Sequence, residues 1–290
     1  KSALAANTTG TRNTAVGSLA LDANTTSNDN SAFGYNSLTE NTTGVDNNAF
    51  GVNTLDANTT GSRNNAFGYQ ALTANTTADD NTALGHKALE DNTTGTRNTA
   101  VGSFAMDTNS TGSYNTAVGY YAMKANTTGS YNTGIGDRAL DSNQTGTRNT
   151  AVGYKALEDT GNGDDNTAVG WQALDDCASS DNTAVGSGAL KLNTTGTENT
   201  AVGAGALDAN TTGSGNVAVG RAALTAQVDG GASNHAFGYY ALAGNTTGDD
   251  NVAVGYQAMI TNTDGDSNTA VGHKALYGNT TGNYNTAVGR

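Results

Sequence analysis

The stretch NTAVGSLALDANTT at positions 13–26 decides the fold, because close variants of it recur along the whole chain. Its glycine, Gly17, has counterparts every 17 residues as far as Gly170. The series then continues to Gly289 with only two altered intervals, one of 16 and one of 18 residues. A short fixed period indicates one supersecondary unit stacked on copies of itself, so the sequence predicts a solenoid.

The repeat is too short to hold a helix together with strands and turns. Its runs between turn signals are four or five residues long and contain β-branched or aromatic members. We therefore predict an all-β fold, a parallel β-solenoid of about 17 coils of 17 residues with two short strands each. Segments such as 41–44 and 92–95 supply turns, and the absence of proline suits strands that donate N–H groups to neighbouring coils. Unbroken repetition predicts a single continuous domain, 1–290, as a segment of a longer fibre.

Two columns of bulky residues, starting at Val16 and Leu21, are expected to fill the coil interior. Two columns of small residues, starting at Ala15 and Ala20, lie beside them. Because neighbours along a strand point to opposite faces, we expect the Ala columns to face away from the bulky ones, toward another backbone. Burying two aliphatic side chains per coil contributes about 4 kcal/mol, whereas ordering 17 residues costs about 25 kcal/mol. A second buried face, and hence a homo-oligomer, is therefore expected.

Asparagine occupies two regular columns. The first predicts a structural amide ladder, in which each side chain bonds to the next coil; it includes Asn13, Asn30, Asn47, Asn64, Asn81, Asn98 and Asn115. The second matches the Asn-x-Ser/Thr glycosylation pattern and is read either as a set of glycan acceptors or as turn chemistry; it includes Asn7, Asn24, Asn41, Asn58, Asn75 and Asn92.

Composition and charge exclude several classes of protein. The formal net charge is −13 with 13% charged residues, which disfavours nucleic-acid binding. No apolar run reaches the length of about 20 residues that crosses a bilayer, so no membrane insertion is expected in this segment. His86, His235 and His273 lie far apart, so no catalytic triad can be assembled and we expect no enzyme activity.

Acidic pairs in turns, such as Asp79 and Asp80, are read as solvated charge or as Ca²⁺ ligands. The full ligand spacing of a calcium loop is absent, so no metal and no cofactor is predicted.

Two exposed columns are candidate binding surfaces. Aromatic residues near the repeat glycine suit sugar rings or an inter-chain seam; they are Tyr120, Tyr121, Tyr154, Trp171, Tyr239, Tyr240 and Tyr256. A threonine row that includes Thr14, Thr82 and Thr99 suggests an ice-binding solenoid as an alternative.

The Asn-Thr-Ala-Val-Gly run followed by x-x-Ala-Leu resembles the head repeats of trimeric autotransporter adhesins, the YadA-like heads, and similar repeats of phage-type trimeric tail fibres. The coil of those heads is shorter, and this chain adds an Asn-Thr-Thr-Gly turn. The resemblance implies a left-handed β-roll, a parallel homotrimer and display on a cell surface or a virion for attachment.

The expected function is thus that of an extracellular fibrous protein, a shaft or head that gives reach and multivalent attachment to surfaces such as glycans. A self-assembling filament with no ligand of its own is the alternative, and ice binding is the third.

Overall fold

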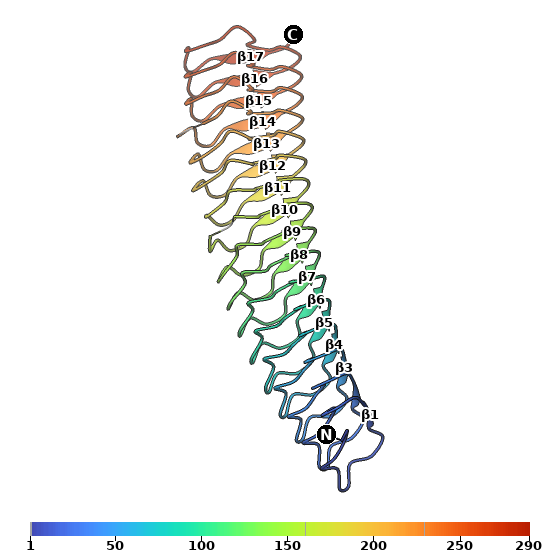
Figure 1. Ribbon diagram of the computed structural model, residues 1–290. Helices are drawn as coiled ribbons and strands as arrows, with labels where there is room; N and C mark the ends of the chain where they lie inside the picture. Colours follow the sequence, from blue (N-terminus) through green and yellow to red (C-terminus); the bar gives the residue numbers. More distant parts are fainter. Residues whose placement is uncertain (1, 160, 229) are drawn as a thin grey trace. The chain divides into compact units, whose positions relative to one another are not determined.

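The computed structural model describes residues 2–159, 161–228 and 230–290. Its contacts divide the chain into two compact units, Lys1–Thr147 (unit 1) and Arg148–Arg290 (unit 2). In these described ranges both units consist of short parallel strands and turns without any helix (Figure 1).

Each described coil contains one three-residue strand. Unit 1 holds β1 (Thr14–Val16), β2 (Ser31–Phe33), β3 (Asn48–Phe50), β4 (Asn65–Phe67), β5 (Thr82–Leu84), β6 (Thr99–Val101), β7 (Thr116–Val118) and β8 (Thr133–Ile135). Unit 2 holds β9 (Thr150–Val152), β10 (Thr167–Val169), β11 (Thr183–Val185), β12 (Thr200–Val202), β13 (Val217–Val219), β14 (His235–Phe237), β15 (Val252–Val254), β16 (Thr269–Val271) and β17 (Thr286–Val288).

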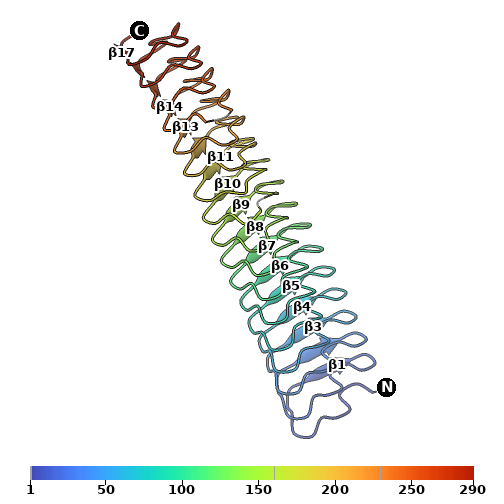
Figure 2. The ribbon, with the colours of Figure 1, turned by 90° about the vertical axis from the view of Figure 1, so that its left-hand side faces the viewer.

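Within each unit, consecutive strands pair in parallel and in register, so equivalent residues of neighbouring coils lie side by side (Figure 2). The register survives both altered intervals. Strand β10 pairs with β11 across the 16-residue interval, and β13 pairs with β14 across the 18-residue one. The predicted parallel β-solenoid is therefore confirmed, and the polar turns absorb the changes in length.

The predicted second strand is not found in the described coils. In the first coil its place, residues 18–22, is taken by turns, because Leu19 and Leu21 have φ angles of 66° and 52° that an extended strand does not allow. The N–H of Leu21 nonetheless donates to the carbonyl oxygen of Ser37 in the next coil at 3.1 Å. This side of the coil thus keeps bonding to its neighbour without β conformation.

The interior differs from the prediction in the Val16 column and in both Ala columns. The Leu column is buried as expected, with Leu38 fully enclosed, but the middle residue of the strands, which is Ala in all but β8, points inward beside it, as Ala32 does. The third strand residue points outward, and Leu84 keeps 49% of its surface exposed. The placement of the Val16 column inside and of the Ala columns outside was therefore wrong. Alternation along the strand allows only one of the two columns inside, and the narrow coil accepts the small one.

Packing around Gly134 shows how closely the interior is filled. Gly134 stands where other strands carry Ala, and a Cβ added there would lie 2.8 Å from Cγ of Met123. We expect Gly134→Ala alone to lower the free energy of unfolding by about 1 kcal/mol through overpacking. The double variant Gly134→Ala/Met123→Leu has the Ala and Leu of the other coils and should be at least as stable as the parent, because Ala loses less backbone entropy on folding. Urea unfolding followed by circular dichroism measures both, and an unchanged or more stable single variant would contradict the expectation.

Candidate functional site

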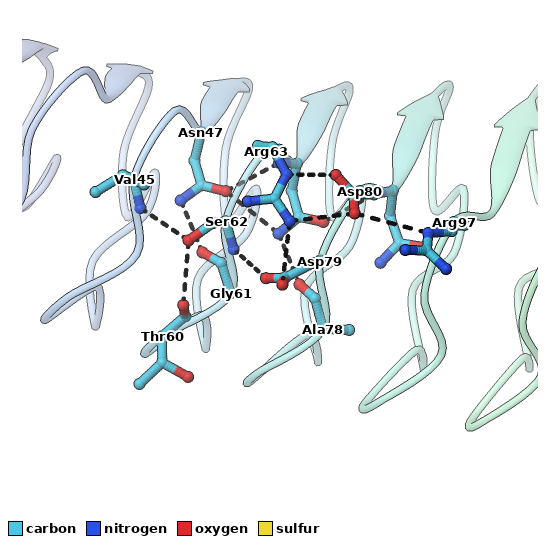
Figure 3. Close-up of polar contacts among 12 residues, drawn as sticks. Val45, Asn47, Thr60, Gly61, Ser62, Arg63, Ala78, Asp79, Asp80 and Arg97 are labelled. Atoms are coloured by element: carbon cyan, nitrogen blue, oxygen red, sulfur yellow. Dashed lines mark hydrogen bonds and ion pairs between the residues drawn. The ribbon is translucent and has the colours of Figure 1, made fainter.

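The first Asn column forms the predicted ladder. Oδ1 of Asn47 accepts the backbone N–H of Asn64 at 3.0 Å, and Nδ2 of Asn47 donates to the carbonyl oxygen of Gly61 at 2.8 Å (Figure 3). The same backbone bond to the preceding Asn is made by Asn30, Asn47, Asn81, Asn98 and Asn115. Each amide therefore bonds through both its oxygen and its nitrogen to the turn one repeat further along the chain and so links two coils, which is a structural role.

The second Asn column forms another ladder, which sequence reasoning left open. Asn58 is fully buried, and its Nδ2 donates to Oδ1 of Asn41 and to the carbonyl oxygen of Gly61, both at 3.0 Å. The buried members also include Asn24, Asn75 and Asn92, while Asn7 is half-buried and its Nδ2 donates to Gly10. A glycan on these buried nitrogens is incompatible with the fold, so we assign the column to turn chemistry. The recurrence of Asn at this position in most coils was the sequence signal for this ladder, as it was for the first column.

Two groups of threonines differ in their hydrogen bonds. Those that follow the second Asn column bond to the next coil, as when Oγ1 of Thr42 donates to the carbonyl oxygen of Thr59 at 3.0 Å. Those that begin the strands, such as Thr82, Thr99 and Thr116, make no side-chain hydrogen bond within the described residues. Their hydroxyls face solvent beside the outward Val, Phe and Leu column.

The candidate aromatic residues do not form one uniform stripe. In unit 2, Tyr239 stacks on Tyr256 at 5.5 Å between ring centroids, and Tyr256 stacks on His273 at 5.2 Å. In unit 1, the rings of Tyr120 and Tyr121 lie 4.0 Å apart. The Tyr256 ring is thus covered on both faces, by Tyr239 and by His273, and presents little face to a sugar.

Tyr154 and Trp171 are arranged differently. They are 43% and 53% exposed, and within the described residues no other ring stacks on them. The Nζ atom of Lys155 lies 5.9 Å from the Tyr154 ring, and that of Lys191 lies 5.6 Å from the Trp171 ring. Unlike Tyr239 and Tyr256, these two rings are not stacked on another ring, and a Lys ammonium group lies over one face of each. Tyr240 packs edge-on against Tyr239.

The acidic turns are engaged in bonds between coils. Oδ1 of Asp79 accepts the backbone N–H of Ser62 at 2.7 Å, and Asp80 pairs with Nε of Arg63 at 2.5 Å (Figure 3). The hydrogen bond from Arg63 lowers the pKa of the Asp80 carboxyl. Within the described residues no group of three or more His, Cys, Asp or Glu side chains is placed to hold a metal ion. Because these pairs are largely exposed, each contributes little to stability.

Two other carboxyls are less hydrated than those in the acidic turns. Burial, and next a hydrogen bond with Glu90, raises the pKa of Asp107 to about 6. Burial, with the charge of Asp176, raises the pKa of Asp175 to about 6 as well. One oxygen of each carboxyl, Oδ1, has no hydrogen-bond partner. Sequence reasoning missed both, since neither Asp carries a sequence signal that distinguishes it from the other acidic residues in turns.

These shifts predict that the fold is more stable in mild acid. A folded pKa above the unfolded value means that the native state binds more protons between about pH 4 and 6, so stability falls as the pH rises through that window. We expect Asp107→Asn and Asp175→Asn to raise the unfolding temperature at pH 7.5 and to leave it nearly unchanged at pH 4.5. Thermal unfolding at both pH values measures this.

Asp165→Asn is the control, because the hydrogen bond from Arg148 lowers the pKa of Asp165. Its stabilising effect is present at neutral pH and disappears only as the pH falls through the depressed folded pKa, so the variant should not raise the unfolding temperature at pH 7.5. If all three variants changed the unfolding temperature equally at pH 7.5, the raised pKa values of Asp107 and Asp175 would be refuted.

The outward surface of the strands, which we call the sheet face, consists of the first and third residues of each strand. None of the chain's 13 Lys and Arg or 26 Asp and Glu residues lies on it. In unit 1, stacked rings begin the apolar column, with Phe33 and Phe50 at 4.6 Å and Phe50 and Phe67 at 4.8 Å. In unit 2 the column is mostly Val.

No pocket is present among the described residues, and none of their segments is a helix able to cross a membrane. A scan against models of known protein families found no match, and a search of characterised proteins found no significant similarity.

Proposed function

We propose that this chain is a structural and adhesive segment of an extracellular fibre, displayed on a cell surface or a virion. The observation that carries the proposal is the in-register ladder. Within each unit, neighbouring described coils bond to each other through equivalent strand and turn contacts and, at most positions, through the same Asn side chains, so coils can be added in one direction while equivalent side chains stay aligned. Such a protein acts as a spacer that presents the same surface contacts repeatedly. The proposal includes no enzyme activity and no cofactor.

Attachment would occur through weak contacts that repeat along the coils. Once one contact forms, its neighbours bind at high effective concentration, so the avidity exceeds the affinity of any one site. Tyr154 and Trp171 are the proposed glycan-contacting residues, because each is about half exposed, no other described ring stacks on it, and a Lys that can donate hydrogen bonds lies beside it. The acidic net charge supports solubility and gives no basis for contact with nucleic acid.

Two measurements on the full chain test the proposal. Small-angle scattering should give an elongated particle, and a compact one would overturn the fibre. Glycan-array binding should fall at least tenfold in Tyr154→Ala/Trp171→Ala but change little in the matched control Tyr239→Ala/Tyr256→Ala. An elongated chain that binds no glycan would support the alternative, a filament without its own ligand.

A further inference from the structure

The column that follows the repeat glycine is interrupted in unit 2. After β10 and β13 this position holds the large residues Trp171 and Arg221, whereas after β11 and β12, which lie between them, it holds Ser187 and Ala204. Both small residues are exposed. We call residues 187–188 and 204–205 the gap, because the row of large side chains stops on one side of it and resumes on the other.

The gap contains open space rather than packed side chains. Its second position is glycine in both coils, and a Cβ added at Gly188 would meet no atom within 4 Å. At Gly205 an added Cβ would meet only Oδ2 of Asp208, at 3.7 Å. The other oxygen of Asp208, Oδ1, accepts a hydrogen bond from the hydroxyl of Thr225 at 2.6 Å. The gap is therefore open to solvent, with a carboxylate at its edge as a hydrogen-bond acceptor.

A cation lies at each end of the gap, and each is held over an aromatic ring. Nζ of Lys191 lies 5.6 Å from the centre of the Trp171 ring, and Cζ of Arg221 lies 5.8 Å from the centre of the Tyr239 ring. Nη1 of Arg221 also donates to the hydroxyl of Tyr239 at 3.2 Å. Contacts with a ring leave N–H groups of both cations available to donate to a ligand.

Neither of these two cations forms an ion pair. Elsewhere in unit 2 Lys155 pairs with Glu158 at 2.6 Å, whereas no carboxylate of the described residues lies within 4.0 Å of the charged nitrogens of Lys191 or Arg221. Lys191 acts on the carboxylate of Asp175 only from a longer distance. In a chain with a net charge of −13, two cations left without a carboxylate at one gap indicate an external anion.

The spacing of the two cations suits an extended saccharide. Lys191 follows β11 and Arg221 follows β13, so their coils are two steps apart, or about 10 Å along the stack. Two linked sugar rings span such a distance, so acid groups on a saccharide chain can meet both cations. A sugar ring beside Trp171 would contact its half-exposed indole, and sugar hydroxyls would donate to Asp208.

We propose that the gap binds an acidic saccharide, one that carries carboxylate or sulfate groups. The inference rests on the proposed attachment to glycans and supplies the chemical class of the glycan. Lys191 and Arg221 pair with the acid groups, Asp208 accepts sugar hydroxyls, and Trp171 provides a ring surface at one end.

The acidic character of the chain as a whole does not oppose this binding strongly. Charges further away than about 8 Å are largely screened at physiological ionic strength, so the groups at the gap have the largest effect. The carboxylate of Asp208 is engaged by Thr225, and Oδ2 of Asp175 accepts a hydrogen bond from Nε2 of Gln172 at 2.9 Å. The affinity should fall as salt is added, because both cations are accessible to solvent ions.

Isothermal titration calorimetry on the full chain tests the proposal with three probes of equal length. These are hexameric oligogalacturonate, its uncharged methyl ester, and a sulfated maltohexaose. At least one acidic probe should bind ten times more tightly than the methyl ester, and the one that does identifies the acid group. Lys191→Gln/Arg221→Gln should weaken that acidic probe at least tenfold and leave the methyl ester unchanged.

The matched control is Lys124→Gln/Lys274→Gln. It removes the same charge from two lysines that also lie over tyrosine rings, those of Tyr121 and Tyr277, but outside the gap. The control should leave the affinity for the acidic probe within about twofold of the parent, since distant charges are screened.

A second variant fills the gap without removing a cation. Ser187→Tyr/Ala204→Tyr places rings at two exposed positions of a column that carries Tyr in other coils, so the fold should be kept, which circular dichroism checks. Binding of the acidic probe should fall at least tenfold because the open space is lost.

The outcomes separate this inference from the proposed glycan attachment. If the methyl ester binds as tightly as both acidic probes, or if neither gap variant weakens an acidic probe, the acidic-saccharide site is overturned, while attachment through Tyr154 and Trp171 stands. If the chain binds no saccharide at all, both are overturned, and the fibre is still tested by small-angle scattering.

Discussion

Gly203→Ala is expected to lower the free energy of unfolding by at least about 4 kcal/mol, through backbone strain together with overlap. Gly203 directly follows strand β12 and has a φ of 134°, a conformation that residues with a side chain rarely adopt. An added Cβ would also overlap the carbonyl group of Gly220 in the next coil. The carbonyl oxygen and carbon of Gly220 cannot move away, because they are backbone atoms held by the hydrogen bonds between coils. Urea unfolding monitored by circular dichroism measures the loss.

The control for this variant lies two residues away. Gly205 has φ of 64°, and the only atom near an added Cβ is a carboxylate oxygen of Asp208 at 3.7 Å. In other coils the same position is occupied by residues such as Lys155 and Gln172 at similar φ angles. Gly205→Ala should therefore cost only about 1 kcal/mol. Equal effects of the two substitutions would mean that close backbone approach does not limit the coil.

The second large effect is expected for Asn199→Ala. Oδ1 of Asn199 accepts the backbone N–H of Asn216 at 3.0 Å, and its Nδ2 donates to the carbonyl oxygen of Gly213 at 2.8 Å. Removing the fully buried amide leaves both backbone groups without a partner, and each such group costs about 1–3 kcal/mol. We expect a loss of about 3–4 kcal/mol in the free energy of unfolding.

Asn283→Ala serves as the comparison, because Asn283 is exposed and its Oδ1 accepts one bond, from the N–H of Asp266. Water can replace that bond, so the change should stay below about 1 kcal/mol. If Asn199→Ala proved as mild as Asn283→Ala, the amide ladder would not be what holds neighbouring coils together.

The sequence predicts this fold well where a residue type is constrained by its neighbour in the next coil. The glycine period fixes the stacking, and the constant Asn column predicts the ladder seen at Asn47 and Asn64. Side-chain direction was harder to predict. An Ala followed by a Val fits a strand with the Ala inside as well as a strand with the Val inside. The outcome depends on the width of the coil, which accepts Ala32 and Leu38 together but leaves no room for Phe33.

The candidate site was predicted less completely. Periodicity placed Tyr154 and Tyr239 in one column, but whether a ring stacks depends on what stands one coil away, and here the neighbours differ. The second strand failed for a similar reason. Leu21 and its equivalents adopt positive φ because the chain must turn sharply to enclose them, a demand of the closed coil that overrides the ordinary preference of leucine.

The in-register ladder has a consequence for how such a protein changes its size. Within a unit each strand pairs only with the strand before it and the strand after it, and the register is the same from pair to pair. Duplicating or deleting one complete repeat in the gene therefore restores each bond with an equivalent partner. The length of a unit can therefore change by one coil at a time, through evolution or by design, without changes to the other coils.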